Sequence, residues 1–340
     1  MDTLKKGEDA LLQKIERHFS RDTHLLARSL RVGIGDDAAI VASKAGYESI
    51  LTCDWFLEGT HFLRDKHPAD SVGWKSLARA LSDVAAMGGL PRHFLLSLAL
   101  PETHLGQWLD GFFEGLRRAS RKFHCYLAGG DTSKRREILI NITVVGQVPS
   151  GRALLRSGAQ PGDVLYVSGR LGAAELGLNL IRRKRSSVGK NDRSLKKHLY
   201  PEPRLALGSW LREKRLASGM MDLSDGLSSD LPRLCQASGV GARIEASRLP
   251  TAQLSPADQK RGLSPLLLAL HGGDDYELLF SVPRRRAKSM PSSWHGVPLT
   301  AIGEMTRGHE IRLVQPSGRE ALLEASGWDP FRQQKNKKQD

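Results

Sequence analysis

The chain has 340 residues, of which 40% are hydrophobic and 26% charged, and its formal net charge is +14. This composition is typical of a soluble globular protein of about two domains and excludes disordered, collagenous and coiled-coil chains. Apolar runs stay far below the ~20 residues that span a bilayer. The three cysteines, Cys53, Cys125 and Cys235, are far apart and favour neither a disulfide framework nor a zinc site. We therefore expect a cytoplasmic protein without a membrane segment.

The positive charge is concentrated in two stretches, 181–197 and 331–340, which together supply ten of the fourteen net charges. Both are polar and poor in large apolar residues, which predicts a solvated loop for the first and a basic disordered tail for the second. A nucleic-acid-binding surface needs clustered basic residues on a shaped face. Binding to nucleic acid is therefore kept only as an alternative function.

The spacing of apolar residues predicts an alternation of strands and helices along the chain. Strands are expected at 47–52, 94–100, 137–148, 164–168, 220–223 and 278–282, and helices at 73–87, 104–122, 171–183, 204–215 and 224–237. The fold class is therefore α/β or α+β. Turn residues after position 148 suggest an N-terminal domain at 1–148 and a C-terminal domain at 149–330, followed by the tail.

Aspartates recur beside glycines or at the ends of apolar runs, where we expect tight turns. Any one such turn is ordinarily explained by a local hydrogen bond from the Asp side chain. Six of them are harder to explain separately, because Asp is a short, hard oxygen ligand and glycine lets the backbone approach a ligand closely. If the turns converge, they predict a site for several Mg²⁺ ions and a nucleotide polyphosphate.

The expected helix at 73–87 places one of these acids. Trp74, Leu77 and Leu81 form an apolar stripe, and Asp83 lies on the opposite side of the helix. Asp83 either pairs with Arg79 at i,i+4 spacing or presents its carboxylate to the metal ions. Both interpretations stay open at this stage.

Familiar nucleotide-binding loops are absent from the sequence. The segment 33–38 matches G-x-G-x-x-A, but its two acids would repel a pyrophosphate, and no helix follows to bind phosphate at its N-terminus. A Walker A loop is also missing. ATP would therefore be bound without a lysine-bearing loop.

Seven blocks occur in a distinctive order between residues 33 and 328: GIGDDAAI, TCDWFLEGTHF, KSLARALSDVAAMGG, AGGDTSK, GRALLRSGAQPGD, MDLSDGLSSDL and LHGGDDYELLF. This order resembles the thiamine-monophosphate kinases, which share a superfamily with aminoimidazole ribonucleotide synthetase. The resemblance implies a two-domain PurM-like fold. In that fold the mixed sheet of the N-terminal domain pairs across a homodimer, and the C-terminal domain is α+β.

The implied activity is phosphorylation of thiamine monophosphate to thiamine diphosphate, with ATP as co-substrate and several Mg²⁺ ions near the dimer interface. An aminoimidazole ribonucleotide synthetase-like ligase remains the alternative within the superfamily. A selenophosphate synthetase would need a reactive Cys in an N-terminal glycine-rich loop, and the first cysteine here is Cys53.

The resemblance also assigns roles to single residues. It implies metal ligands at Asp37, Thr52, Cys53, Asp54, Asp83, Asp131, Asp222 and Asp225. Contacts to the nucleotide are implied for Gly130, Asp131, Arg156 and Ser224, and contacts to thiamine monophosphate for His61, Asp274 and Trp328. The catalytic group is expected to be Asp131, Asp225 and Arg156.

Three residues depart from the family pattern: Cys53 and Trp55, which replace the two Thr of a usual Thr-Asp-Thr segment, and Asp274. Cys53 replaces a usual Thr, so its carbonyl rather than its sulfur is expected to face Mg²⁺. Asp274 replaces a usual Glu and is one methylene shorter, which favours a water-bridged substrate contact.

The chemistry of this reaction fits a site rich in carboxylates. A phosphate monoester has its second pKa near 6, so at pH 7 the acceptor is mostly ionised and needs no general base. The obstacle is repulsion between two anions, which Mg²⁺ and Arg156 would relieve. We therefore expect direct in-line transfer without a phosphoenzyme.

Overall fold

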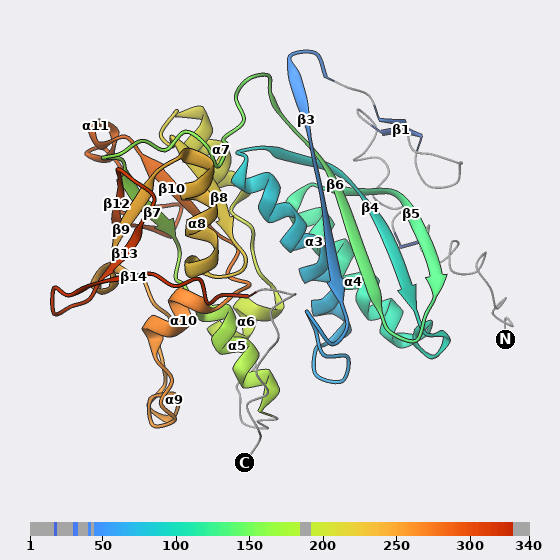
Figure 1. The fold of residues 1–340 in the computed structure, drawn as a ribbon. Coiled ribbons are helices and arrows are strands. Elements are labelled where there is room, and N and C mark those ends of the chain that lie inside the picture. The colour runs from blue at the N-terminus through green and yellow to red at the C-terminus, as the bar shows by residue number, and fades with distance from the viewer. Residues whose placement is uncertain (1–16, 19–29, 33–39, 42–43, 184–191, 329–340) are drawn as a thin grey trace, which may run out of the picture.

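The computed structural model describes residues 17–18, 30–32, 40–41, 44–183 and 192–328. These residues form a four-stranded sheet, an eight-stranded sheet and a two-stranded ladder, with their helices (Figure 1). Asp37 and the expected tail at 331–340 lie outside the described residues. None of the described helices is long and apolar enough to cross a membrane.

The first part of the molecule is a four-stranded mixed sheet in the order β3-β6-β4-β5. Strands β4 and β5 are parallel and are connected by α4, whereas β6 pairs antiparallel with both β3 and β4. A two-stranded ladder, β1 with β2, precedes it. The elements are β1 (Leu30–Val32), β2 (Ile40–Val41), β3 (Tyr47–Leu57), α3 (Ala69–Ala86), β4 (Leu90–Leu100), η2 (Glu102–His104), α4 (Gln107–Phe123), β5 (Tyr126–Lys134) and β6 (Leu139–Pro149).

The second part is built on an eight-stranded sheet in the order β14-β13-β9-β12-β7-β10-β8, with β11 attached to β12. Its strands are β7 (Val164–Ser168), β8 (Gly219–Leu223), β9 (Gly241–Glu245), β10 (Glu277–Val282), β11 (Ser293–Trp294), β12 (Val297–Thr306), β13 (Ile311–Val314) and β14 (Glu320–Leu322). Its helices are α5 (Ala173–Arg182), α6 (Arg193–Leu199), α7 (Leu205–Glu213), α8 (Leu227–Ser238), η3 (Ala246–Arg248), α9 (Pro256–Gln259), α10 (Pro265–His271) and α11 (Arg284–Ala287). The two-domain α/β and α+β fold class is thus confirmed.

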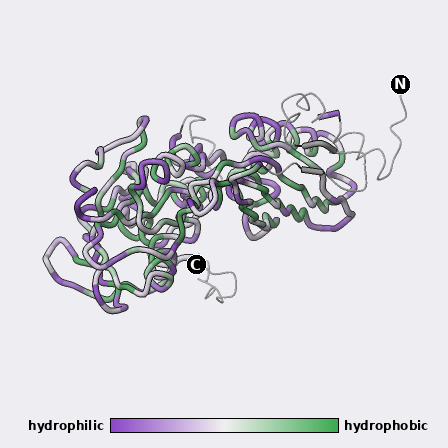
Figure 2. The backbone as a smooth tube through the Cα atoms, turned by 90° about the horizontal axis from the view of Figure 1, so that it is seen from above, coloured by the Kyte–Doolittle hydropathy of each residue, from purple (hydrophilic) through white to green (hydrophobic). Residues whose placement is uncertain are grey.

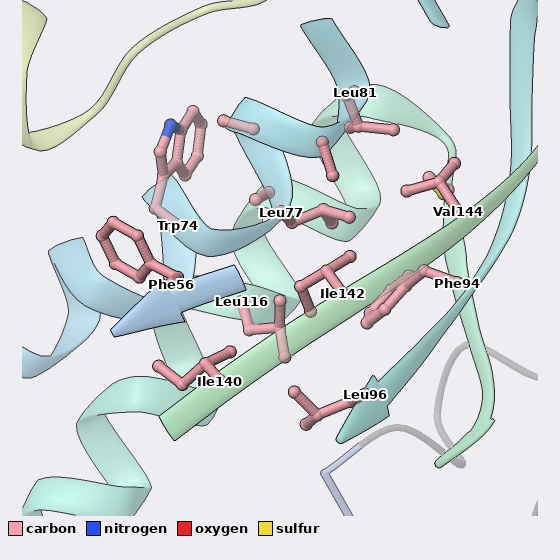
Figure 3. Packing of buried hydrophobic residues seen from close by; sticks show 14 of the residues in the cluster. Phe56, Trp74, Leu77, Leu81, Phe94, Leu96, Leu116, Ile140, Ile142 and Val144 are labelled. Carbon is pink, nitrogen blue, oxygen red and sulfur yellow. The ribbon is translucent and has the colours of Figure 1, made fainter. Parts of the chain in front are cut away.

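Helices α3 and α4 cover one face of the four-stranded sheet, and the hydrophobic core of the first part lies between them and the strands. Figure 3 shows Leu77 and Leu81 of α3 above Ile142 of β6 and Phe94 of β4. Figure 2 shows hydrophobic segments running through the interior of both parts of the molecule. Burial of these side chains, at about 25 cal/mol per Å², is the main force that holds α3 on the sheet.

The stripe on α3 is confirmed, but the expectation of one buried face is wrong. Besides Trp74 and Leu77, the polar residues Ser71, Lys75 and Ser82 are buried. The reason is that α3 also contacts α6, α7, β8 and β10, so it lies between the two parts of the molecule (Figure 1). Side chains on the second face of α3 therefore meet the second domain rather than water.

Two acids expected in tight turns lie inside strands instead: Asp54 within β3 and Asp131 within β5. Asp83 and Asp222 lie within α3 and β8, in the helix and the strand expected at 73–87 and 220–223. The glycines before Asp131 allow close strand pairing rather than a turn, since a Cβ on Gly130 would lie 1.9 Å from the Leu96 carbonyl oxygen. Only the segments around 224–226 and 272–276 are loops of the expected kind.

The stretch 181–197, expected to be a solvated loop, is helical near both of its described ends. Arg182 ends α5 and residues 193–199 form α6, whereas residues 184–191 lie outside the described residues. The Asp192 side chain accepts hydrogen bonds from the backbone N–H groups of Ser194 and Leu195, which caps this helix. Lys197 forms an ion pair with buried Glu277. The prediction failed here because it treated basic residues as solvated, whereas one of them neutralises a buried acid.

Candidate active site

A cavity of about 470 Å³ opens between the two parts of the molecule. Its walls come from β3 and the following loop, α3, α5, the end of β8, the loops at 224–226 and 272–276, and the segment 326–328. Eight of the residues assigned from the sequence line it: Asp54, His61, Asp83, Asp222, Ser224, Asp225, Asp274 and Trp328. Sequence positions up to about 270 residues apart are therefore brought to one site.

Four carboxylates, from Asp54, Asp83, Asp222 and Asp225, form what we call the acidic wall of this cavity. Burial raises the pKa of Asp222 to about 8, and the charge of Asp83 adds to this effect. Burial also raises the pKa of Asp83, and Asp54 raises it further, although a hydrogen bond from Thr52 opposes the change. These acids repel one another, so the wall favours the arrival of a cation.

Three of the four acids are held by a neighbouring side chain. Thr52 lies on the same face of β3 as Asp54, and its hydroxyl donates to Asp83. The Arg79 Nε lies 3.4 Å from Asp54 Oδ2. Arg233 Nη1 lies 2.7 Å from Asp225 Oδ2. The i,i+4 pair of Arg79 with Asp83 considered from the sequence is therefore replaced by a pair with Asp54, because α3 packs against β3.

Asp230, which the sequence did not single out, fixes the backbone conformation of the loop at 224–226. Asp230 is fully buried and accepts hydrogen bonds from the backbone N–H groups of Ser224 and Asp225, both at 3.0 Å. Gly226 has φ +101, and a Cβ there would meet the His271 backbone at 2.9 Å. The loop is therefore rigid before any ligand binds.

The donor set of the acidic wall suits Mg²⁺ in chemistry, since all its groups are hard oxygens. Among the described residues, however, no three His, Cys, Asp or Glu side chains are grouped closely enough to hold an ion by themselves. Mg²⁺ is commonly bound by one or two carboxylates together with water and substrate phosphates. The acidic wall fits a site of this kind, in which the nucleotide completes the coordination of Mg²⁺.

The opposite wall contains one acid whose charge is already balanced. Asp274 Oδ2 lies 2.8 Å from the Nζ of Lys75, which is buried in α3, and the Tyr276 hydroxyl donates to Asp274 Oδ1 at 2.7 Å. Burial alone would raise the pKa of Asp274, but Lys75, His198 and Arg79 together hold it well below its usual range. Asp274 also has φ +67, an uncommon conformation for Asp that this packing maintains.

Two buried imidazoles extend this ion pair. Lys75 Nζ lies 3.3 Å from His198 Nδ1, and His198 Nε2 lies 3.0 Å from His67 Nε2. A protonated lysine can only donate, so His198 Nδ1 accepts from Lys75. His67 Nδ1 accepts a hydrogen bond from the Leu63 backbone N–H at 3.1 Å and lies 3.2 Å from the Leu63 carbonyl oxygen. Burial lowers the pKa of His67 to about 4 and that of His198 well below its usual value, so both rings are neutral.

The other two residues assigned to the substrate also line the cavity. His61 Nδ1 accepts a hydrogen bond from the Leu57 backbone N–H at 3.0 Å, which places the ring proton on Nε2. Burial, with a smaller effect of Arg79, lowers the pKa of His61 to about 4. The Trp328 backbone N–H donates to the Asp225 carbonyl at 2.9 Å, which fixes the segment that carries the indole.

Five assigned residues within the described part of the chain do not line the cavity: Thr52, Cys53, Gly130, Asp131 and Arg156. Cys53 lies on the outer face of the sheet, where its Sγ is 3.1 Å from Asn141 Nδ2. Gly130 and Asp131 lie on β5, three strands from β3, a separation of about 14 Å at the usual strand spacing. Arg156 is exposed in the loop after β6, but it is close enough to Asp83 to lower the pKa of that carboxyl.

Sequence reasoning missed several cavity residues, among them His67, Glu175, Leu178, Arg182, His271 and Tyr276. Glu175, Leu178 and Arg182 lie on one side of α5, at the i, i+3 and i+7 spacing that could have identified a shared face. The remaining residues carry no pattern of their own, since a lone His or Tyr is as often part of a core.

Comparisons with known proteins agree with this geometry. Residues 35–148 match the family model "AIR synthase related protein, N-terminal domain" and residues 160–315 match the corresponding C-terminal domain. The thiamine-monophosphate kinase of Escherichia coli K12 is 38% identical over 324 residues, which cover 93% of this chain and 97% of that protein. The chain belongs to the thiamine-monophosphate kinase family.

Solved structures give the same result. The thiamine-monophosphate kinase from Stenotrophomonas maltophilia K279a is 33% identical, with a TM-score of 0.78, over 93% of this chain and 96% of that chain. AaThiL complexed with AMPPCP and TMP is also 33% identical, with a TM-score of 0.76, over 97% of this chain and 99% of that chain. The PurM-like fold expected from the resemblance is thus confirmed.

Proposed function

We propose that the cavity is the active site at which this enzyme transfers the γ-phosphoryl group of ATP to thiamine monophosphate, giving thiamine diphosphate and ADP. The observation that carries the proposal is that one cavity joins an unbalanced acidic wall, which favours cations, to a wall that bears His61, Asp274 and Trp328. The homologous complex with AMPPCP and TMP supports the same pair of ligands.

We assign the nucleotide phosphates to the acidic wall. Asp54, Asp83, Asp222 and Asp225 would hold Mg²⁺ there, with Asp37 and the carbonyl of Cys53 assigned only from the resemblance. Bound Mg²⁺ would neutralise and bridge the phosphates, which relieves the repulsion between donor and acceptor. Arg156, close to Asp83, is positioned to add positive charge on the solvent side.

We assign thiamine monophosphate to the opposite wall. Asp274, held ionised by Lys75, suits the cationic and amino-bearing rings of this substrate, and Trp328 can stack on one of them. His61 offers a neutral Nε2–H donor. No group in this arrangement needs to remove a proton from the acceptor, which agrees with direct transfer and without a phosphoenzyme.

The test is an assay of purified protein with ATP, Mg²⁺ and thiamine monophosphate, with thiamine diphosphate detected through its fluorescent oxidation product. We expect product formation that depends on Mg²⁺ and that stops in Asp225→Asn. The exposed Glu114→Gln on α4 is the matched control and should behave like wild type. Absence of product with the wild-type protein, or an unaffected Asp225→Asn, would refute the proposal. Radiolabel from ATP trapped on the protein would refute direct transfer.

We further propose a homodimer formed through the outer face of the four-stranded sheet. No described helix covers this face, and Leu51, Trp55 and Leu95 are 71%, 55% and 38% exposed on it. Large exposed apolar side chains on one sheet face mark an interaction surface. Asp131 shares this face, since the strand register aligns it through Ser97 and Asn141 with Trp55.

This placement suggests that Gly130 and Asp131 serve the site of the other subunit. Mixed dimers test the idea with two inactive variants, Asp131→Asn and Asp222→Asn. If Asp131 acts across the interface, each mixed dimer has one intact site, and a random equimolar mixture regains about one quarter of wild-type activity. If Asp131 acts within its own subunit, the mixture stays inactive.

We place the enzyme in the cytoplasm. The three cysteines are free, with Cys125 and Cys235 buried, as is usual for a reducing compartment. Detection of the protein in a cytosolic rather than a membrane or secreted fraction tests this location.

A further inference from the structure

Arg79 occupies the middle of the cavity, between the acidic wall and the wall that carries Asp274. It extends from α3, and its Cζ lies 5.5 Å from the centre of the Phe56 ring. Within the described part of the chain, its one ion pair is the 3.4 Å contact of Nε with Asp54 Oδ2. The side chain is 14% exposed, so it is packed but still reaches the cavity surface.

The guanidinium of Arg79 has unused hydrogen-bonding capacity. Its Nη1 is buried and has no hydrogen-bond acceptor among the described residues. Buried donors are nearly always paired, and a guanidinium is always charged, so an orphan N–H here indicates a missing anion. The single long contact with Asp54 leaves the fork of the guanidinium open to a bidentate partner.

The surroundings of Arg79 indicate which anion this is. His61 is a close neighbour, since the charge of Arg79 contributes to the lowered pKa of its ring. His61 Nε2–H and the free N–H of Arg79 are therefore two neighbouring donors in the lining of the cavity. The acidic wall on the other side needs cations before it can accept phosphates, whereas Arg79 can bind a phosphate directly.

We propose that Arg79 is a further catalytic residue, which binds the phosphate group of thiamine monophosphate and carries positive charge at the point of transfer. The inference rests on the proposed function of the cavity. An oxygen of the bound phosphate forms a bond to the γ-phosphorus of ATP, and the bond from that phosphorus to the β-bridging oxygen breaks. ADP leaves with the electron pair. No proton moves, since the acceptor is already ionised.

Arg79 would hold the acceptor through two N–H groups and stabilise the charge that spreads over the transferring group. This is the role that an arginine supplied within the chain has in other phosphoryl transfers. Nothing in the sequence pointed to it, because at i,i+4 spacing from Asp83 it had a sufficient structural explanation.

The experiment compares Arg79→Met, Arg79→Lys and wild type, with Arg117→Met on α4 as matched control, because Arg117 is similarly packed but does not line the cavity. For Arg79→Met we expect kcat/KM for thiamine monophosphate to fall about 100-fold or more, with KM for ATP within threefold of wild type. Arg79→Lys, which keeps the charge but loses the fork, should fall in between. Arg117→Met should leave all constants unchanged.

Thiamine, which lacks the phosphate, provides the readout that a merely structural role would not give. Its inhibition constant should be the same in wild type and Arg79→Met, because only the phosphate contact is removed. The inference is overturned if Arg79→Met keeps kcat/KM within threefold, or if affinity for ATP or thiamine falls in parallel with that for thiamine monophosphate. If Arg79→Met does not fold, the same comparison is made with Arg79→Lys. A wild-type protein that forms no thiamine diphosphate refutes the proposed function instead.

Discussion

The two walls of the cavity shift the pKa values of their carboxylates in opposite directions. On the acidic wall, Asp83 and Asp222 face other acids, and burial together with this repulsion raises their pKa values. On the facing wall, Asp274 is just as enclosed, but Lys75 and its neighbours hold its pKa well below the usual range. The first wall is thus completed only by a cationic ligand, whereas the second is complete before the substrate arrives. The difference lies in the partners, since both walls use the same residue type.

The largest effect that would sharpen this contrast is expected for Asp222→Asn. Loss of a carboxylate at the nucleotide end should lower activity by at least about 100-fold. Stability should not fall, because the raised pKa of Asp222 shows that its charge is unfavourable in the folded protein at pH 7. Activity is measured by product formation and stability by the thermal midpoint without Mg²⁺. A variant that unfolds at a clearly lower temperature would contradict this description of the acidic wall.

For Lys75→Met we expect a loss of stability, in contrast to Asp222→Asn. Removing one partner of a buried ion pair leaves an uncompensated charge on Asp274, at a cost of about 3–5 kcal/mol in the free energy of unfolding. Lys134→Met is the control, since it breaks an exposed pair of similar length with Glu102 and should cost less than about 1 kcal/mol. Urea unfolding measures both. Equal losses of unfolding free energy in the two variants would show that the buried pair of Lys75 with Asp274 contributes no more than an exposed pair.

The neutral imidazoles beside Lys75 predict a dependence of stability on pH. The pKa of His67 is lowered to about 4, so between pH 6.5 and about 4 the unfolded chain binds more protons than the folded one. The contribution of this neutral ring is therefore present above pH 6.5 and is lost as the pH falls toward 4. His67→Gln removes the titration, so its stability deficit relative to wild type should shrink by about 2 kcal/mol between pH 7.5 and pH 5.

The control for this measurement is His309→Gln, because His309 is exposed. Its difference from wild type should be the same at both pH values. A deficit of His67→Gln that does not change with pH would mean that the ring is already charged in the folded protein.

The last effect concerns protection of the fold by a bound ligand. Mg²⁺ with a non-hydrolysable ATP analogue at about 100 times its dissociation constant should stabilise the wild type by about 2.7 kcal/mol. Asp83→Asn should lose most of this protection, because it removes a ligand from the acidic wall. Asp274→Asn should keep it, because Asp274 is assigned to the other substrate. Equal protection of both variants in a thermal-shift assay would remove the distinction between the two walls.

The sequence by itself determined the family, the fold class and part of the cavity. The order of its glycine- and aspartate-rich blocks identified eight residues that the structure brings together, although Asp54 and Asp131, which were expected in turns, lie within strands. Local patterns sufficed because each block carries its chemistry within a few residues. The fold then brings these blocks together around one cavity.

Only the tertiary structure decided which charges meet. Lys75 and Asp274 are 199 positions apart, and neither the spacing nor the composition of α3 shows that a lysine on it is buried. The same holds for Arg79 beside Asp54 and for Asp131 on the outer face of the sheet. Charges interact through distance in space and through burial, and both are set by the packing of α3 between two domains rather than by its neighbours in sequence.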